Sequence, residues 1–297
     1  MSASTKVWTA LVTVYLLWGS TYLGIAYAGE TIPPLFAAST RFIAAGILLG
    51  AIAVLRGGTL RVSHRALASC VLVGALLPGA NAILFVAERH VPSGLSALIF
   101  ASVPLWLAAL RLTRERLPWQ MLAGVGTGFA GVAVLARPSG GATGFGIGLV
   151  VLAAAMWATG SYLSSRLPLP EDAFAATSLE TFFGGLVLLP LGALSVHHFS
   201  PSAASLAGWA YLVTFGSLLG LTAYVWLLGN APLGLVSTYA YVNPIVAITL
   251  GVIFRGEHVT WRLLAGAAIV VVAVAAVVRQ EPAGPRGEPA PEPVAVD

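Results

Sequence analysis

Long apolar runs separated by short polar connections dominate the chain. Crossing a bilayer takes about 20 predominantly apolar residues. Ten runs of roughly that length occur, at residues 7–28, 35–55, 66–87, 93–112, 119–136, 145–165, 173–196, 206–229, 233–254 and 261–278. Breakers and charges fall between them, as in Arg56-Gly57-Gly58 and in the stretch 167–172. The pattern predicts an all-α membrane protein with ten transmembrane helices.

Composition supports lipid exposure. Of 297 residues, 58% are hydrophobic and 9% are charged, whereas soluble domains carry about 25% charged residues. The formal charge of +4 comes from short basic clusters between apolar runs, which indicates topology signals and no nucleic-acid partner. Cys70 is the single cysteine, so the chain forms no internal disulfide. The first run is too long for the apolar region of a signal peptide, and we interpret it as a retained helix.

The chain contains an internal repeat. Pro92-Ser93-Gly94-Leu95 recurs as Pro232-Leu233-Gly234-Leu235, an offset of roughly 140 residues. We predict one five-helix repeat over 1–137, a second over 145–279, and a disordered polar tail over 280–297. Because five is odd, the second repeat must enter the membrane from the opposite face, which gives inverted topology.

Basic residues predict the orientation. With a cytoplasmic N-terminus, most basic residues of the first half fall inside: Lys6, Arg56, Arg61, Arg65, Arg111, Arg114 and Arg116. Only Arg89 and Arg137 of that half fall outside. Short cytoplasmic loops carry such an excess, so both termini are predicted to be cytoplasmic.

Two ionisable residues lie within predicted spans. Arg41 and Glu180 occupy equivalent repeat positions, and inverted topology places them at depths about 10 Å apart. We therefore expect two separate roles and no direct ion pair. Arg41 is a candidate gate or anion contact, and Glu180 a candidate gate or proton-titrating group. The alternative is that each bonds helix carbonyls or hydroxyls for structural reasons alone.

Interrupted helices and mid-span polar or aromatic residues mark a candidate substrate cavity. Proline frees backbone carbonyls at membrane depth, and paired interruptions point to a midplane site. The candidate lining residues are Trp18, Tyr22, Asn81, Pro104, Trp157, Tyr162, Tyr239, Tyr241, Asn243 and Pro244. Packing kinks, interfacial anchoring and helix–helix hydrogen bonds are the alternatives. Glu88-Arg89-His90 is expected to be a solvated loop.

Enzyme signatures are absent from the sequence. It contains no HExxH, GxSxG, P-loop or CxxC motif, and its histidines fall in loops or at span ends. We therefore predict no enzymatic activity, no cofactor and no metal site.

Four motifs together resemble the EamA family of the drug/metabolite transporter superfamily. They are Leu17-Trp18-Gly19-Ser20-Thr21-Tyr22, Arg41-Phe42-x-x-Ala45-Gly46, Ala87-Glu88-x-x-Val91-Pro92-Ser93-Gly94 and residues 237–244. The resemblance implies an inner-membrane protein of ten helices in two inverted repeats. It also implies that the first, third, fourth, sixth, eighth and ninth helices surround the cavity, with Arg41 and Glu180 nearer the flank. Related small multidrug pumps use a first-helix carboxylate, which this chain lacks, so their proton exchange is not carried over.

The expected function is alternating-access export of small metabolites that are amino acid-like, purine-like or drug-like. The expected partners are that substrate, the lipid bilayer, and protons as a candidate coupling ion through Glu180. Import or uniport within the same superfamily remains open. A channel would need a polar stripe along several helices, and an intramembrane enzyme would need a catalytic constellation at depth. Neither pattern is present in the sequence.

Overall fold

The computed structural model describes residues 3–279 except 113, 115, 117 and 138–140. Within these residues all regular secondary structure is helical. The predicted all-α fold class is confirmed for this part of the chain. The predicted disordered tail, 280–297, lies outside the described residues.

The helices follow the apolar runs closely. The first half contains α1 (Ala3–Ala28), α2 (Pro34–Leu55), α3 (His64–Ala87), α4 (Ser93–Phe100), α5 (Val103–Arg111) and α6 (Trp119–Leu135). The second half contains α7 (Gly144–Ser164), α8 (Ala173–Leu194), α9 (Ala203–Tyr211), η1 (Leu212–Leu219), α10 (Gly220–Asn230), α11 (Leu233–Val236), α12 (Tyr239–Arg255) and α13 (Trp261–Arg279). Helices α9 and α10 are continuous through η1, which is a π-helix.

Eight helical segments of the described residues are long and apolar enough to cross a membrane. They are Ser4–Ala28, Pro34–Leu55, His64–Ala87, Ser93–Arg111, Gly144–Ser164, Ala173–Leu194, Ala203–Asn230 and Trp261–Arg279. The other two predicted spans correspond to shorter apolar helices, α6 and α12, of 17 residues each. At 1.5 Å per residue each is about 25 Å long, slightly less than a bilayer core.

The two predicted helix interruptions differ. Between α4 and α5 the chain breaks at Ala101–Ser102, and Pro104 lies in the first turn of α5, where a missing N–H costs little. In the second half the break falls at Ser237–Thr238, between α11 and α12. Pro244 lies further on, inside α12. Pro104 therefore accompanies a break, whereas the helix continues past Pro244.

The helices of the bundle pack closely where glycine, which has no side chain, lies at the contact. Helices α2 and α8 run antiparallel, with Gly46 against Phe182 and the Ser178 hydroxyl donating to the Gly46 carbonyl at 2.9 Å. Gly74 of α3 and Gly184 of α8 bring their backbones into contact. Without a hydrophobic force between helices in lipid, such small-residue contacts supply packing.

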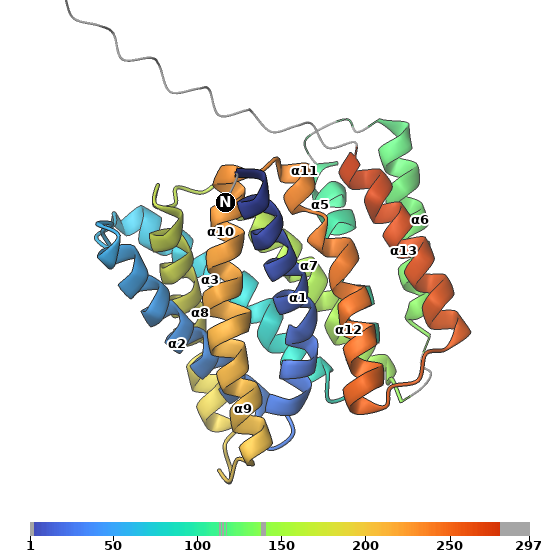
Figure 1. The fold of residues 1–297 in the computed structure, drawn as a ribbon, viewed down its shortest axis with the longest axis horizontal. Helices are drawn as coiled ribbons and strands as arrows, with labels where there is room; N and C mark the ends of the chain where they lie inside the picture. Colours follow the sequence, from blue (N-terminus) through green and yellow to red (C-terminus); the bar gives the residue numbers. More distant parts are fainter. Residues whose placement is uncertain (1–2, 113, 115, 117, 138–140, 280–297) are drawn as a thin grey trace, which may run out of the picture.

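Figure 1 shows α1 in the middle of the bundle, with α2, α3 and α8 on one side and the pair α6 and α13 on the other. Helices α1, α3 and α12 end at the same face, where α2, α4 and α13 begin. Glu30 lies there, and this is called the Glu30 face. The face at which α1 and α11 begin is called the opposite face.

Candidate functional site

An aromatic cluster lies between α1, α10 and α12. The Trp18 ring centroid is 4.8 Å from that of Tyr224 and 5.1 Å from that of Tyr239, and the two tyrosine rings are 5.9 Å apart. Trp18 and Tyr239 belong to the predicted cavity set. Tyr224 was not predicted, because nothing along α10 distinguishes it from an ordinary apolar-face tyrosine.

Polar groups adjoin this cluster. The Tyr15 hydroxyl hydrogen-bonds the Thr238 hydroxyl, joining α1 to the break before α12. Asn243 is buried, and with its side-chain amide nitrogen turned toward α1 it donates to the carbonyls of Tyr15 and Tyr239 at 3.3 and 3.1 Å. Three predicted residues, Trp18, Tyr239 and Asn243, therefore meet at one seam between the two halves of the chain.

The remaining predicted cavity residues lie elsewhere. Tyr22 is buried in the core formed with α3 and α4. Trp157 packs edge-on against Phe100, with centroids 5.8 Å apart. Tyr241 points to α13, where its hydroxyl donates to the Val274 carbonyl at 3.5 Å.

Tyr162 lies near the end of α7, beneath the Arg166 guanidinium at 3.7 Å. Asn81 and the two prolines are also outside the aromatic cluster. Asn81 contacts Arg41, Pro104 begins α5, and Pro244 lies within α12 beyond Asn243.

Arg41 is a buried cation with neutral partners. Its side chain is 4% exposed; Nε donates to the Ser217 hydroxyl at 3.0 Å and Nη1 donates to the Asn81 Oδ1 at 3.3 Å. The rings of Phe42 and Phe85 lie 4.9 and 5.9 Å from its guanidinium carbon. Among the described residues no carboxylate forms an ion pair with Arg41, so its contacts are neutral acceptors and aromatic rings.

The π-helix η1 lies against this part of the molecule. Ser217, the partner of Arg41, belongs to η1, and a Cβ at Gly216 would approach Thr21 of α1 to 2.9 Å. At Gly220, just after η1, a Cβ would lie 2.6 Å from Trp18 Nε1. Short π-helical segments occur frequently at functional sites. The sequence offered no signal for this one beyond the two glycines.

Glu180 is separated from Arg41 along the α2–α8 contact. Ser178 and Phe182 flank Glu180, and both contact Gly46 of α2. Gly46 is more than a helical turn from Arg41, so the two groups differ in height by roughly 7–10 Å. They form no ion pair.

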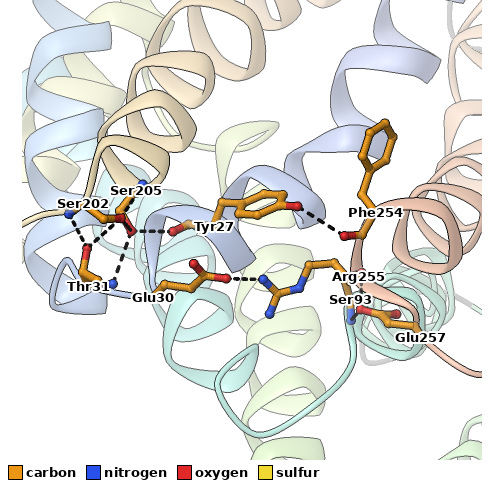
Figure 2. A network of polar contacts seen from close by, with 9 residues as sticks. All are labelled: Tyr27, Glu30, Thr31, Ser93, Ser202, Ser205, Phe254, Arg255 and Glu257. Atoms are coloured by element: carbon orange, nitrogen blue, oxygen red, sulfur yellow. Dashed lines mark hydrogen bonds and ion pairs between the residues drawn. The ribbon is translucent and has the colours of Figure 1, made fainter.

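Contacts at the Glu30 face join the two halves of the chain (Figure 2). Glu30, which follows α1, is ion-paired with Arg255 at the end of α12. The Tyr27 hydroxyl donates to the Phe254 carbonyl at 3.3 Å, and the Arg255 guanidinium lies over the Tyr27 ring at 5.3 Å.

Glu257 and a serine–threonine cluster add two further links. The Glu257 carboxylate accepts from Ser93 N at 2.8 Å, Ser93 Oγ at 2.7 Å and Gly94 N at 3.1 Å, so a residue of the second half caps α4 of the first. Thr31 Oγ1 accepts from Ser202 N at 2.9 Å, and the Ser205 hydroxyl donates to the Tyr27 carbonyl at 2.8 Å. Figure 2 shows these groups in one row across the face.

Glu88 does not lie in a solvated loop, contrary to expectation. It directly follows α3, and both carboxylate oxygens are buried without a hydrogen-bond partner. It lines a cavity of about 210 Å³ together with Glu30, Arg89 and Arg255. Burial raises the pKa of the Glu88 carboxyl well above its usual range; Glu257 raises this pKa further, and Arg255 lowers it. The sequence did not predict this burial, because residues at the end of a span are usually solvated.

The opposite face is closed by apolar packing. Leu11 and Val14 of α1, Leu227 of α10 and Val236 of α11 are buried in one cluster. Two arginines near this face lie over aromatic rings: Arg56 over Phe174 at 4.5 Å and Arg166 over Tyr162 at 3.7 Å. In the described part of the chain no group of three or more His, Cys, Asp or Glu side chains is arranged to hold a metal ion.

Known proteins resemble the chain over nearly its whole length. The model of the EamA-like transporter family matches twice, at residues 6–137 and 144–279. The "Uncharacterized inner membrane transporter YedA" of Escherichia coli (strain K12) is 36% identical over 278 residues, covering 89% of each chain. The "Probable terminal-alkyne amino-acid exporter" of Streptantibioticus cattleyicolor is 30% identical over 291 residues, covering 92% of this chain and 93% of that protein.

Solved structures support the same fold. One crystal structure superposes with a TM-score of 0.65 at 19% identity, covering 93% of this chain and 97% of the other. At that identity the likeness concerns the fold alone. The family matches and the named relatives together show a membrane transporter of the drug/metabolite type, as the sequence motifs predicted. The chain belongs to the EamA-like transporter family.

Proposed function

We propose that this transporter exports small metabolites, with amino acid-like compounds as the first substrate class to test, by alternating access between two inverted five-helix halves. The observation that carries the proposal is the row of contacts across the Glu30 face, each of which joins one half to the other. A rocking motion of the halves would break these contacts and open the bundle from the Glu30 face toward the aromatic seam.

The aromatic seam suits a small organic substrate. Trp18, Tyr224 and Tyr239 present ring faces and edges, while Thr238 and Asn243 supply hydrogen-bonding groups beside them. Ligand sites commonly combine apolar walls with a few polar groups of this kind. Tyr22, Trp157 and Asn81 remain proposed lining residues that would join the site in another conformation.

The surroundings of Arg41 favour a substrate that carries an acidic group. Its guanidinium is buried with two neutral acceptors and no carboxylate, and η1 places it close to Thr21 of α1. A substrate carboxylate would satisfy that charge. The relative named as an amino-acid exporter agrees with this class. Glu180 remains the intramembrane candidate for proton coupling, and its test is substitution by glutamine.

We also propose that both termini are cytoplasmic and that the Glu30 face is external. Lys6, Arg56, Arg65 and Arg111 all lie at the opposite face. Cytoplasmic loops carry such an excess of basic residues. Protease protection of a C-terminal tag in inside-out and right-side-out vesicles would test the orientation.

The function is tested in proteoliposomes with a panel of radiolabelled amino acids, purines and cationic drugs. We expect saturable movement of at least one amino acid, and its loss in Arg41→Gln and Trp18→Ala. Protein-free liposomes are the background, and Leu122→Ala, on the exposed surface of α6, is the control variant. A flat response of the wild-type protein to the whole panel would count against the proposal.

A further inference from the structure

The Glu88 carboxylate is a buried acid that no protein group satisfies. Both oxygens lack a hydrogen-bond partner, and the side chain faces the cavity beside the Glu30–Arg255 pair. An unpaired charge in such a place is strongly unfavourable. In this closed arrangement the stable form of Glu88 is therefore the neutral acid.

Three of the charged groups around Glu88 are already engaged. Arg255 pairs with Glu30, and Glu257 is held by Ser93 and Gly94 at the start of α4. Arg89 lines the same cavity, and Tyr22 of α1 is close enough for the Glu88 charge to act on its hydroxyl. Arg255 thus lines the same cavity as two carboxylates, Glu30 and Glu88, and this structure pairs it with Glu30.

We propose that Glu88 is a proton-binding site that controls the Glu30 face. With the proton bound, Glu88 is neutral and Arg255 stays with Glu30, so α12 remains tied to the end of α1. When the proton leaves to water in the cavity, the Glu88 carboxylate attracts Arg255, and the tie to Glu30 is released. The assignment of this step to transport rests on the proposed function, whereas the proton site itself does not.

A proton fits this site better than a metal or an organic cation. Arg89 and Arg255 beside the same cavity would repel a further cation, and Glu88 is the one carboxylate lining it without a partner among the described residues. Burial among these groups also raises the pKa of Glu88 well above its usual range, which favours the protonated form. The site is distinct from Glu180, which lies in α8 against α2 and α3.

The test measures opening of the Glu30 face without any substrate. In a Cys70→Ala background, Ala26→Cys places a thiol in the wall of the cavity. The rate of labelling by a bulky, membrane-impermeant maleimide is measured from about pH 5.5 to about pH 8.5. Each rate is divided by the rate for the unfolded protein at the same pH. We expect the normalised rate to rise with pH by about two- to fivefold, the factor by which losing a partly exposed ion pair shifts an opening equilibrium.

Glu88→Gln mimics the protonated acid and should give a low rate that does not change with pH. Glu171→Gln, at an exposed residue of the opposite face, should follow the parent. Glu88→Asp should keep the response with a shifted midpoint, and it decides the question if Glu88→Gln fails to fold. A flat parent profile, or a Glu88→Gln profile like the parent, overturns the proposal. If the labelling depends on pH as expected while the protein transports no compound of the proteoliposome panel, that result would support the proton site and refute the transport function.

Discussion

The two ends of the bundle are closed by different chemistry. At the Glu30 face the contacts are polar: an ion pair, a carboxylate cap on α4 and a serine–threonine cluster. At the opposite face Leu11, Val14, Leu227 and Val236 pack in an apolar cluster. Polar contacts respond to pH and salt, and apolar packing does not. We therefore expect changes in pH and salt to act mainly on the contacts of the Glu30 face.

The difference also bears on how each face would open. Water can replace the hydrogen bonds of Tyr27, Thr31 and Glu257 when the Glu30 face parts, so the cost of opening is moderate. Water cannot replace the contacts of the apolar cluster in this way. If the opposite face parts, its side chains must find new apolar contacts.

Leu11→Ala should weaken the opposite face most. Leu11 is fully buried, and a leucine-to-alanine change in a packed core costs roughly 2–4 kcal/mol. Equilibrium unfolding in mixed micelles measures this loss, which should be the same at low and high salt. Leu122→Ala on α6, where leucine is 41% exposed, is the matched control. An effect no larger than the control would show that the cluster does not close this end.

Glu257→Ala should be the most damaging single change at the Glu30 face. It removes three hydrogen bonds from the start of α4, and we expect a loss of about 2–3 kcal/mol in the free energy of unfolding. Glu257→Gln keeps the acceptor oxygen and should lose less. Equal losses for the two variants would contradict the capping role.

Glu88→Gln should change how stability depends on pH. The raised pKa means that the folded protein holds a proton that the unfolded chain has released. The free energy of unfolding should therefore fall as pH rises above the usual carboxyl range. Glu88→Gln should remove this decline and be the more stable protein at alkaline pH. Parallel profiles for the two proteins would show that Glu88 is not the titrating group.

The Glu30–Arg255 pair should contribute least to stability. The side chains of Arg255 and Glu30 are 32% and 41% exposed, and exposed pairs are worth about 0.2–1 kcal/mol. A double-mutant cycle with Glu30→Gln and Arg255→Gln should give a coupling in this range that shrinks as salt is added. A coupling that is large and independent of salt would place the pair among the buried contacts instead.

Much of the fold could be predicted because apolar length and repeat spacing are local properties. The ten apolar runs correspond to helices, and the resemblance carried by residues 17–22 and 237–244 identified the family. The interruptions were harder to predict. Proline weakens a helix, yet the second break falls at Ser237–Thr238 and not at Pro244. The contacts around a helix determine where it breaks.

The candidate site could be predicted only in part because a sequence does not give helix rotation. Tyr239 and Tyr241 are neighbours in the chain, but one faces Trp18 and the other faces α13. Tyr224 and Ser217 belong to α10 and η1, and their roles depend on what packs opposite them. Glu88 looked solvated because it ends a span, and only the fold brings Arg255 and Glu257 beside it.

Covalent closure of the Glu30 face would show whether that face opens during transport. In a Cys70→Ala background, Glu30→Cys and Arg255→Cys are joined by a short, reducible bifunctional thiol reagent, and movement of the compound found with the panel is measured before and after reduction. Opening of the face during transport predicts that the cross-linked protein transports nothing and that reduction restores the rate of the unmodified double variant. Transport by the cross-linked protein at the unmodified rate would contradict it.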